Sequence, residues 1–419
     1  MNEHLDSYNH IKAWVPRGLL ELSTQHNIPG CTKEGLTPIQ LRWRNGHLLQ
    51  PHPLPPGLPL PRMMVLPRLV DAHVHLDKAF TWSNHPNLSG TYEGALKANL
   101  MEHRSRSADM VLARGERAMQ QAFSQGLRAV RSHIDSGGFE IESSWEALLT
   151  LQGRWNGQLE LQLVALAPLA FWSSPEGQLM AVRVAQCGGL LGGVLDPSMI
   201  GSKVDRQLRI LLQLADRHGC GVDLHIDESD KAPAQGIQQL LLALCVTPVA
   251  VPVTCSHVSS LALLPQASLQ RLGERMAMAK LQVIALPLTN AWLLARNPDI
   301  TPLHRPQAPI RQLQRCGVQV AVAGDNVADP WFPGGDFDPL TLMATAIPLT
   351  QLLPWQRLGL APFTTAAARI LDLSWDGVLR EGAPADLICV EGNSWSDAMR
   401  RSSSRKVLVQ GNWLAPFNR

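Results

Sequence analysis

Histidine and acidic side chains follow four short apolar runs of this sequence. They are His73 and His75 after the first run, His225 and Glu228 after the second, His257 after the third and Asp325 after the fourth. His73 and His75 are two positions apart, so both would point to one face of an extended strand. Imidazole and carboxylate groups bind divalent metals. The H-x-H pair alone leaves metal binding and chance equally open. The whole set favours a shared metal, because several unpaired polar groups are costly to bury.

These runs belong to a longer alternation of apolar runs with amphipathic stretches, such as 108–125 and 206–218. Several runs are rich in Val, Ile and Leu on both faces, as strands of a parallel sheet are. The expected strands are 68–76, 127–134, 159–166, 192–195, 221–226, 251–256, 281–286 and 317–323. Eight strands with intervening helices predict an α/β fold, a (β/α)₈ TIM-type barrel whose active site lies at the C-terminal ends of the strands.

Both ends of the chain differ from this pattern. A β segment is expected at 39–49 with a turn at Asn45-Gly46, and a proline-rich stretch at 50–67 is expected to be an irregular crossing. Residues 387–390 and 405–410 are predicted strands near the C-terminus. We therefore expect a small β-sandwich domain formed from residues 1–66 and 372–419, and a barrel from 67 to 371.

Composition limits the classes of partner. The 37 basic and 35 acidic residues leave a formal net charge of +2, which favours neither nucleic acid nor an anionic membrane. The first residues show no signal-peptide pattern, and no apolar stretch is long enough to span a membrane. The 7 cysteines include no C-x-x-C pair. We expect a cytoplasmic protein without disulfides. The number of subunits is left open, and a homo-oligomer is one of the alternatives.

Several stretches together resemble the amidohydrolase superfamily, and within it the cytosine deaminase branch. They are VDAHVHLD (70–77), SGTYEG (89–94), RSHID (131–135), HIDE (225–228), TCSH (254–257), PLTNAWL (287–293) and DNVADPWFP (325–333). The resemblance covers the chain from about residue 66 to 371. It implies a mononuclear metal-dependent hydrolase that acts on a carbon–nitrogen bond.

The resemblance also implies roles for single residues. One divalent metal, Fe²⁺ or Zn²⁺, would be bound by His73, His75, His225 and Asp325. A divalent metal lowers the pKa of a bound water, so that hydroxide is available near neutral pH. Asp325 would also accept the proton of that water, and His257 would stabilise developing charge. Glu228 would protonate a ring nitrogen of the substrate.

Two other metal schemes fit the sequence poorly. Binuclear relatives usually bridge their metals with a carboxylated lysine on the fourth strand, and residues 188–200 contain no lysine. The zinc deaminases that edit nucleic acids need a P-C-x-x-C motif, which this chain lacks.

The substrate-reading positions depart from the cytosine deaminase pattern. The glutamine expected after the third strand is absent from residues 166–172, Asn326 stands for an aspartate, and Trp292 stands for a histidine. Trp331 is present and could stack on a flat ring or simply pack in its loop. His133 is expected to line the site, although a structural hydrogen bond would explain it equally well. Asn326 is expected to line it too.

Two residues next to the H-x-H pair carry further expectations. Asp77 is predicted to orient His73 or His75 without binding the metal itself. Lys78 is predicted to pair with an acidic neighbour.

Three functions remain open on these grounds. The first is a deaminase of a cytosine-like N-heterocycle, which releases ammonia. The second is an amidohydrolase that opens a cyclic amide or removes an alkylamine from a triazine-like ring. The third is a barrel kept as a binding scaffold, although such proteins typically lose metal ligands that this chain retains.

Overall fold

The computed structural model describes residues 9–22, 31–138, 141–196, 199–297, 299–400 and 404–415. Eight parallel strands form its central sheet in sequential order. They are β6 (Leu69–Val74), β7 (Leu127–Asp135), β8 (Glu160–Pro168), β9 (Leu190–Leu195), β10 (Val222–Ile226), β11 (Val253–His257), β12 (Gln282–Ala285) and β13 (Gln319–Val322). A parallel bridge between Val74 and Asp325 brings the last strand back to the first. The predicted (β/α)₈ barrel is confirmed, including the short glycine-containing strand β9.

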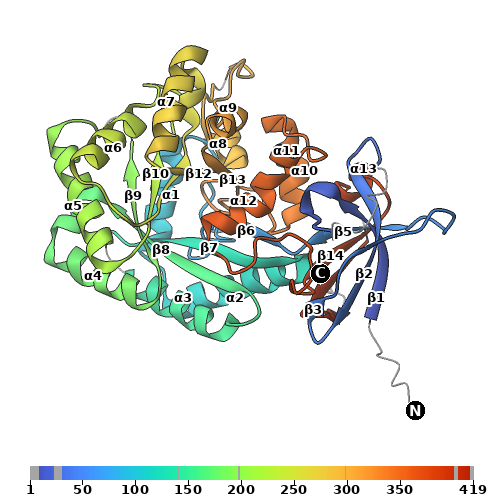
Figure 1. Cartoon of the computed structure of the whole chain (residues 1–419). Coiled ribbons are helices and arrows are strands. Elements are labelled where there is room, and N and C mark those ends of the chain that lie inside the picture. Colours follow the sequence, from blue (N-terminus) through green and yellow to red (C-terminus); the bar gives the residue numbers. More distant parts are fainter. Residues whose placement is uncertain are drawn as a thin grey trace.

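Helices surround the barrel in Figure 1. The helices are α1 (Tyr92–His103), α2 (Ala108–Gln125), α3 (Ile141–Trp155), α4 (Pro175–Gln186), α5 (Ser202–His218), α6 (Gln235–Val246), α7 (Gln266–Met278), α8 (Pro287–Leu293), α9 (Ile310–Arg315), α10 (Pro339–Thr350), α11 (Arg357–Leu360), α12 (Thr365–Ile370) and α13 (Trp395–Ala398). Ser107 caps α2, where its side chain accepts a hydrogen bond from the backbone N–H of Met110, and Gly126 ends that helix in the left-handed conformation. No helix in the described ranges has both the length and the apolar character that crossing a membrane requires.

The two ends of the chain meet in a second sheet, where blue and red strands lie side by side in Figure 1. Its strands are β1 (Asn9–Pro16), β2 (Leu36–Arg44), β3 (His47–Leu48), β4 (His52–Pro53), β5 (Met63–Pro67), β14 (Leu387–Glu391), β15 (Arg405–Val409) and β16 (Asn412–Trp413). Alternate residues of β5 face opposite sides. Met64 and Leu66 pack into the barrel core, and Val65 packs into a smaller core beneath the sheet.

This second sheet corrects one expectation and adds a strand. The proline-rich stretch is not wholly irregular, because it contains β4 and β5. Strand β5 ends at Pro67 and pairs with β14, so this proline does not prevent sheet pairing there. Strand β1 was not predicted, and it pairs along its whole length with β2. The boundaries at residues 66 and 371 stay a prediction.

Candidate active site

The side chains that we expected to bind a metal gather at the C-terminal ends of the barrel strands. His73 lies in β6, His75 follows that strand, His225 lies in β10 and His257 ends β11. Asp325 follows β13, and its backbone N–H donates to the carbonyl of His73 at 2.8 Å. The same contact that brings the ends of the barrel together therefore delivers Asp325 to the histidines.

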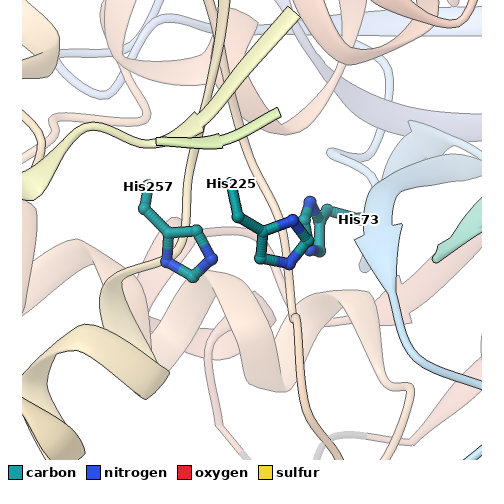
Figure 2. A group of neighbouring side chains, drawn as sticks. All are labelled: His73, His225 and His257. Atoms are coloured by element: carbon teal, nitrogen blue, oxygen red, sulfur yellow. The ribbon is translucent and has the colours of Figure 1, made fainter. Parts of the chain in front are cut away.

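The distances among these groups are short. Asp325 Oδ1 lies 3.3 Å from His75 Nε2 and 3.6 Å from His73 Nε2. The ring centroids of His73 and His225 are 4.7 Å apart, and those of His225 and His257 are 5.0 Å apart. In Figure 2 the three imidazoles of His73, His225 and His257 project from different strands toward one region, and their ligand atoms lie within 4.8 Å of one another.

Unpartnered polar atoms in this cluster fit a divalent metal. His73 Nε2 and both carboxylate oxygens of Asp325 are buried and have no hydrogen-bond partner among the described residues. Such atoms are costly to bury unless something binds them. Imidazole nitrogen and carboxylate oxygen are suitable donors for Zn²⁺ or Fe²⁺, so the residues present fit the expected group.

Electrostatics keeps these groups in the protonation states that a metal needs. Burial, together with the neighbouring imidazoles, holds the pKa values of His73 and His225 well below the usual histidine range, so both rings are neutral. Burial also tends to raise the pKa of Asp325. The nearby imidazoles of His75 and His257 outweigh that effect, so the pKa of Asp325 lies below its usual value.

Backbone strain directs two of the side chains. His257 has φ +74° and Asp325 has φ +64°, both in the left-handed region that non-glycine residues rarely adopt. Each such residue costs on the order of 1–3 kcal/mol and persists where the surrounding structure enforces it, often at functional sites. Both side chains line the cavity, His257 at the end of β11 and Asp325 just after β13.

His73 is oriented by side chains of β10 and β11, which are not adjacent to its own strand β6, and not by Asp77. His73 Nδ1 lies 3.0 Å from Ser256 Oγ, and that hydroxyl donates to Asp223 Oδ1 at 2.8 Å. Asp77 Oδ2 accepts hydrogen bonds from Arg106 Nη1 and from the backbone N–H of Asp135, both at 3.0 Å. The expectation that Asp77 orients a histidine was therefore wrong, because Arg106 and the β7 backbone bind its carboxylate.

Glu228 follows β10 on the same side of the barrel. Burial raises the pKa of its carboxyl well above the usual range, and the negative charges of Asp325 and Asp196 add to that effect. Glu228 Oε1 lies 3.3 Å from His257 Nδ1 and accepts a hydrogen bond from Asn290 Nδ2, also at 3.3 Å. A carboxyl group that keeps its proton near neutral pH can act as a general acid.

A cavity of about 450 Å³ opens above the cluster. His75, His225, Glu228, His257 and Asp325 line it, together with Trp331, Asn326, Tyr92, Lys78 and Asp135. Its other walls are largely apolar, with Leu96, Leu100, Leu166, Pro168, Val194 and Met199 among them. Pockets of this size and character are typical of small-molecule sites.

Of the three residues expected to contact the substrate, two line the cavity and one does not. Trp331 and Asn326 line the cavity. His133 does not line it, because its ring stacks on His73 at a centroid distance of 3.7 Å, behind the cavity wall. A substrate contact from His133 is therefore unsupported.

Lys78 pairs with an acidic neighbour as expected, with Nζ 2.7 Å from Asp135 Oδ1.

Comparisons with known proteins agree with this geometry. The model of the Amidohydrolase family matches residues 174–415. A pterin deaminase from Rhizobium rhizogenes is 31% identical over 350 residues, which cover 83% of this chain and 79% of the relative. The chain belongs to the amidohydrolase family. It is accordingly a hydrolase of carbon–nitrogen bonds other than peptide bonds.

Two further relatives show how this amidohydrolase compares with proteins of related fold. N-isopropylammelide isopropyl amidohydrolase from a Pseudomonas species is 23% identical over 358 residues, which cover 83% of this chain and 84% of the relative. The structure of 5-methylcytosine deaminase from Klebsiella pneumoniae superposes with a TM-score of 0.80 at 22% identity, over 97% of this chain and 98% of that one. The latter likeness shows a shared fold.

Sequence reasoning missed four residues of the amidohydrolase site. Ser256 and Asp223 lie inside strands, and their contact depends on the pairing of β10 with β11. Asn290 stands in the PLTNAWL stretch and Tyr92 in SGTYEG. Both stretches had marked the family resemblance, so that signal was present without a role attached.

Proposed function

We propose that this amidohydrolase removes an amino group from a flat N-heterocycle of the pterin or cytosine kind, with release of ammonia. One observation carries the proposal. Glu228, whose pKa burial raises, shares one cavity with His225, His257 and Asp325. An acid close to a metal-ligand cluster can protonate a ring nitrogen while water adds to the adjacent carbon. The likeness to a pterin deaminase supports this choice.

Each side chain has a proposed part in the reaction. His73, His75, His225 and Asp325 would bind one divalent metal, Fe²⁺ or Zn²⁺. When bound, that ion would supply a water of lowered pKa as the nucleophile. The Asp325 carboxylate would accept a proton from the attacking water, and Glu228 would donate one to the ring nitrogen. His257 Nε2 would donate a hydrogen bond to the oxygen that gains charge. Water and the amino-heterocycle become the oxo-heterocycle and ammonia.

The cavity favours a substrate that is larger than a single pyrimidine ring. No glutamine stands at the end of β8, where Leu166, Ala167 and Pro168 line the wall. Trp331, in the loop after β13, also lines the cavity, and its ring lies at a centroid distance of 5.0 Å and an interplanar angle of 74° from that of Tyr92. An apolar wall with aromatic rings suits a flat two-ring compound such as a pterin.

A second candidate is the removal of an alkylamine from a triazine-like ring. The apolar wall at Leu166, Pro168 and Val194 would accommodate an alkyl group on the leaving nitrogen. The likeness to N-isopropylammelide isopropyl amidohydrolase supports it. The same acid, Glu228, would protonate the substrate in either reaction.

Product analysis separates these candidates. Zinc-loaded or iron-loaded protein is incubated with pterin, cytosine, 5-methylcytosine and N-isopropylammelide, and ammonia and isopropylamine are measured. We expect ammonia, fastest with pterin. The control variant Glu228→Gln should lose about 10²–10⁴-fold in rate and keep its metal. Isopropylamine release alone would favour the second candidate. No product from any compound would contradict both.

We further propose a cytoplasmic enzyme without nucleic-acid partners, in which a homo-oligomer is allowed. All seven cysteines are free thiols, as is usual for a reducing compartment.

A further inference from the structure

Asn290 is a buried amide that the proposed chemistry does not use. It lies in α8, directly after β12, and its side chain is fully buried. It does not line the cavity, whereas its neighbour Thr289 does. An amide buried this deeply costs free energy unless its polar atoms have partners. Its Oδ1 has no hydrogen-bond partner among the described residues, so the partners of Nδ2 are the polar contacts that hold this amide.

Those partners are the two side chains next to the reaction centre. Asn290 Nδ2 lies 3.0 Å from His257 Nδ1 and 3.3 Å from Glu228 Oε1. His257 Nδ1 and Glu228 Oε1 are themselves 3.3 Å apart, so the three groups form a compact triangle. The three residues come from elements that meet only in the folded barrel: α8, the end of β11 and the segment after β10.

The chemistry of an amide nitrogen decides the state of the imidazole. The NH₂ group of asparagine has two hydrogens to donate and cannot accept. His257 Nδ1 must therefore be the acceptor, so the ring proton is on Nε2. His257 Nε2 is buried and has no partner within the described ranges, although the ring lines the cavity. That N–H is thus available to an oxygen bound beside the metal ligands.

We propose that Asn290 is a positioning residue that holds His257 in the Nε2–H tautomer and fixes the Glu228 carboxyl beside it. The inference rests on the proposed roles of His257 and Glu228. Through this one side chain, the hydrogen-bond donor and the general acid keep a constant separation. The left-handed backbone of His257 fixes the direction of the ring, and Asn290 fixes which nitrogen carries the proton.

Two variants and one control test this proposal. Asn290→Leu has a similar size and makes no hydrogen bond. Asn290→Asp has the same shape, and its carboxylate would accept a hydrogen bond from His257 Nδ1–H and so favour the opposite tautomer. The control is Thr254→Val. Thr254 is a buried residue of β11 that bonds Gln282 at 3.2 Å, away from the cavity.

The first readout is the tautomer itself, which requires no activity. Zinc-loaded protein labelled with ¹⁵N-histidine is examined by NMR, and His257→Asn identifies the signal of that ring. We expect the Nε2–H tautomer in the parent and in Thr254→Val, a mixture in Asn290→Leu and the Nδ1–H tautomer in Asn290→Asp. An Nδ1–H tautomer of His257 in the parent would overturn the proposal, because the amide oxygen of Asn290 and not its nitrogen would then face the ring.

The second readout separates positioning from folding. We expect kcat to fall on the order of 10²-fold in Asn290→Leu and further in Asn290→Asp, with KM and zinc content nearly unchanged. Unchanged kcat, or loss of kcat together with zinc, would overturn the proposal. A parent that releases no ammonia but shows the expected tautomers would contradict the proposed function and leave this inference standing.

Discussion

The hydroxyl oxygen of Ser256 lies 3.0 Å from Nδ1 of His73, and the same hydroxyl donates a hydrogen bond to Asp223 Oδ1 at 2.8 Å. A hydroxyl has one proton, so Ser256 Oγ must accept from His73 Nδ1–H. The lone pair of His73 is then on Nε2, the atom that lies 3.6 Å from Asp325 Oδ1. A contact between two strands thus selects the tautomer that can bind a metal.

Replacing Ser256 should therefore weaken metal binding. In Ser256→Ala the Nδ1–H of His73 loses its acceptor. We expect metal affinity to fall about 10–100-fold, as it does when other residues that hydrogen-bond to a metal-binding side chain are removed. Competition with a chelator and elemental analysis measure this. Thr254→Val, on the same strand, should bind metal like the parent. Equal affinity in Ser256→Ala would show that the ring is held by its packing alone.

Arg131 should matter for stability because it neutralises a buried carboxylate. Its Nη1 lies 2.9 Å from Asp223 Oδ2, and both side chains are almost fully buried. Arg131→Met leaves Asp223 without its cation, and we expect a loss of about 3–5 kcal/mol in the free energy of unfolding. Urea unfolding measures it.

The comparison for Arg131 is an ion pair at the surface. Arg183 lies 2.7 Å from Glu142, whose side chain is 73% exposed. Arg183→Ala should cost less than about 1 kcal/mol. Similar losses in both variants would contradict the importance of the buried pair.

The strands and the gathering of the histidines with Asp325 could be predicted because each has a local signature. Runs of apolar residues marked all eight barrel strands, and His73, His225 and Asp325 stand at or just beyond strand ends, where a barrel carries its active site. Strand β1 was missed because its sequence, NHIKAWVP, mixes polar and apolar residues without a clear period.

Side-chain contacts between strands could not be predicted, because they depend on the register in which the strands pair and on the layer of the barrel that each residue occupies. Ser256 stands beside His225 only because β10 and β11 pair in that register. His133 was expected at the cavity, but strand alternation gives the side of a residue and not its layer inside the barrel. Asp77 follows the H-x-H pair closely, yet the chain turns after β6 and its carboxylate meets Arg106 instead.

The loop that carries Trp331 should make stability depend on pH. Asp329 is buried, and burial raises its pKa to about 6 even though Asn326 and the backbone of Trp331 donate to it. The folded-state pKa is above the unfolded value of about 3.9. The stabilising contribution is therefore complete below about pH 4 and is lost as pH rises through about 6.

Asp329→Asn removes this titration. Between pH 4 and pH 7 the parent should lose about 2–3 kcal/mol relative to the variant, from a shift of roughly 2 pKa units. Urea unfolding of chelator-treated protein at several pH values measures the difference without a contribution from metal binding. A difference that stays constant with pH would show that Asp329 does not titrate in this range.

Trp331 should contribute to substrate binding through its ring. It lines the cavity beside Tyr92, and its backbone N–H donates to Asp329 Oδ1 at 2.8 Å. In Trp331→Ala we expect kcat/KM for pterin to fall roughly 10–100-fold, which corresponds to an aromatic contact of about 1–3 kcal/mol. Trp331→Phe should retain most of the activity, because a flat ring remains.

The alternative is that Trp331 only packs its loop, and thermal unfolding distinguishes the two. A packing role predicts a lower Tm in Trp331→Ala and an equal loss of activity on every substrate. A ring contact predicts a nearly unchanged Tm and a larger loss on pterin than on cytosine, since a two-ring substrate offers more surface to the indole. Trp413→Ala is the matched control. Trp413 is 45% exposed on the terminal sheet, and its removal should leave kcat/KM unchanged.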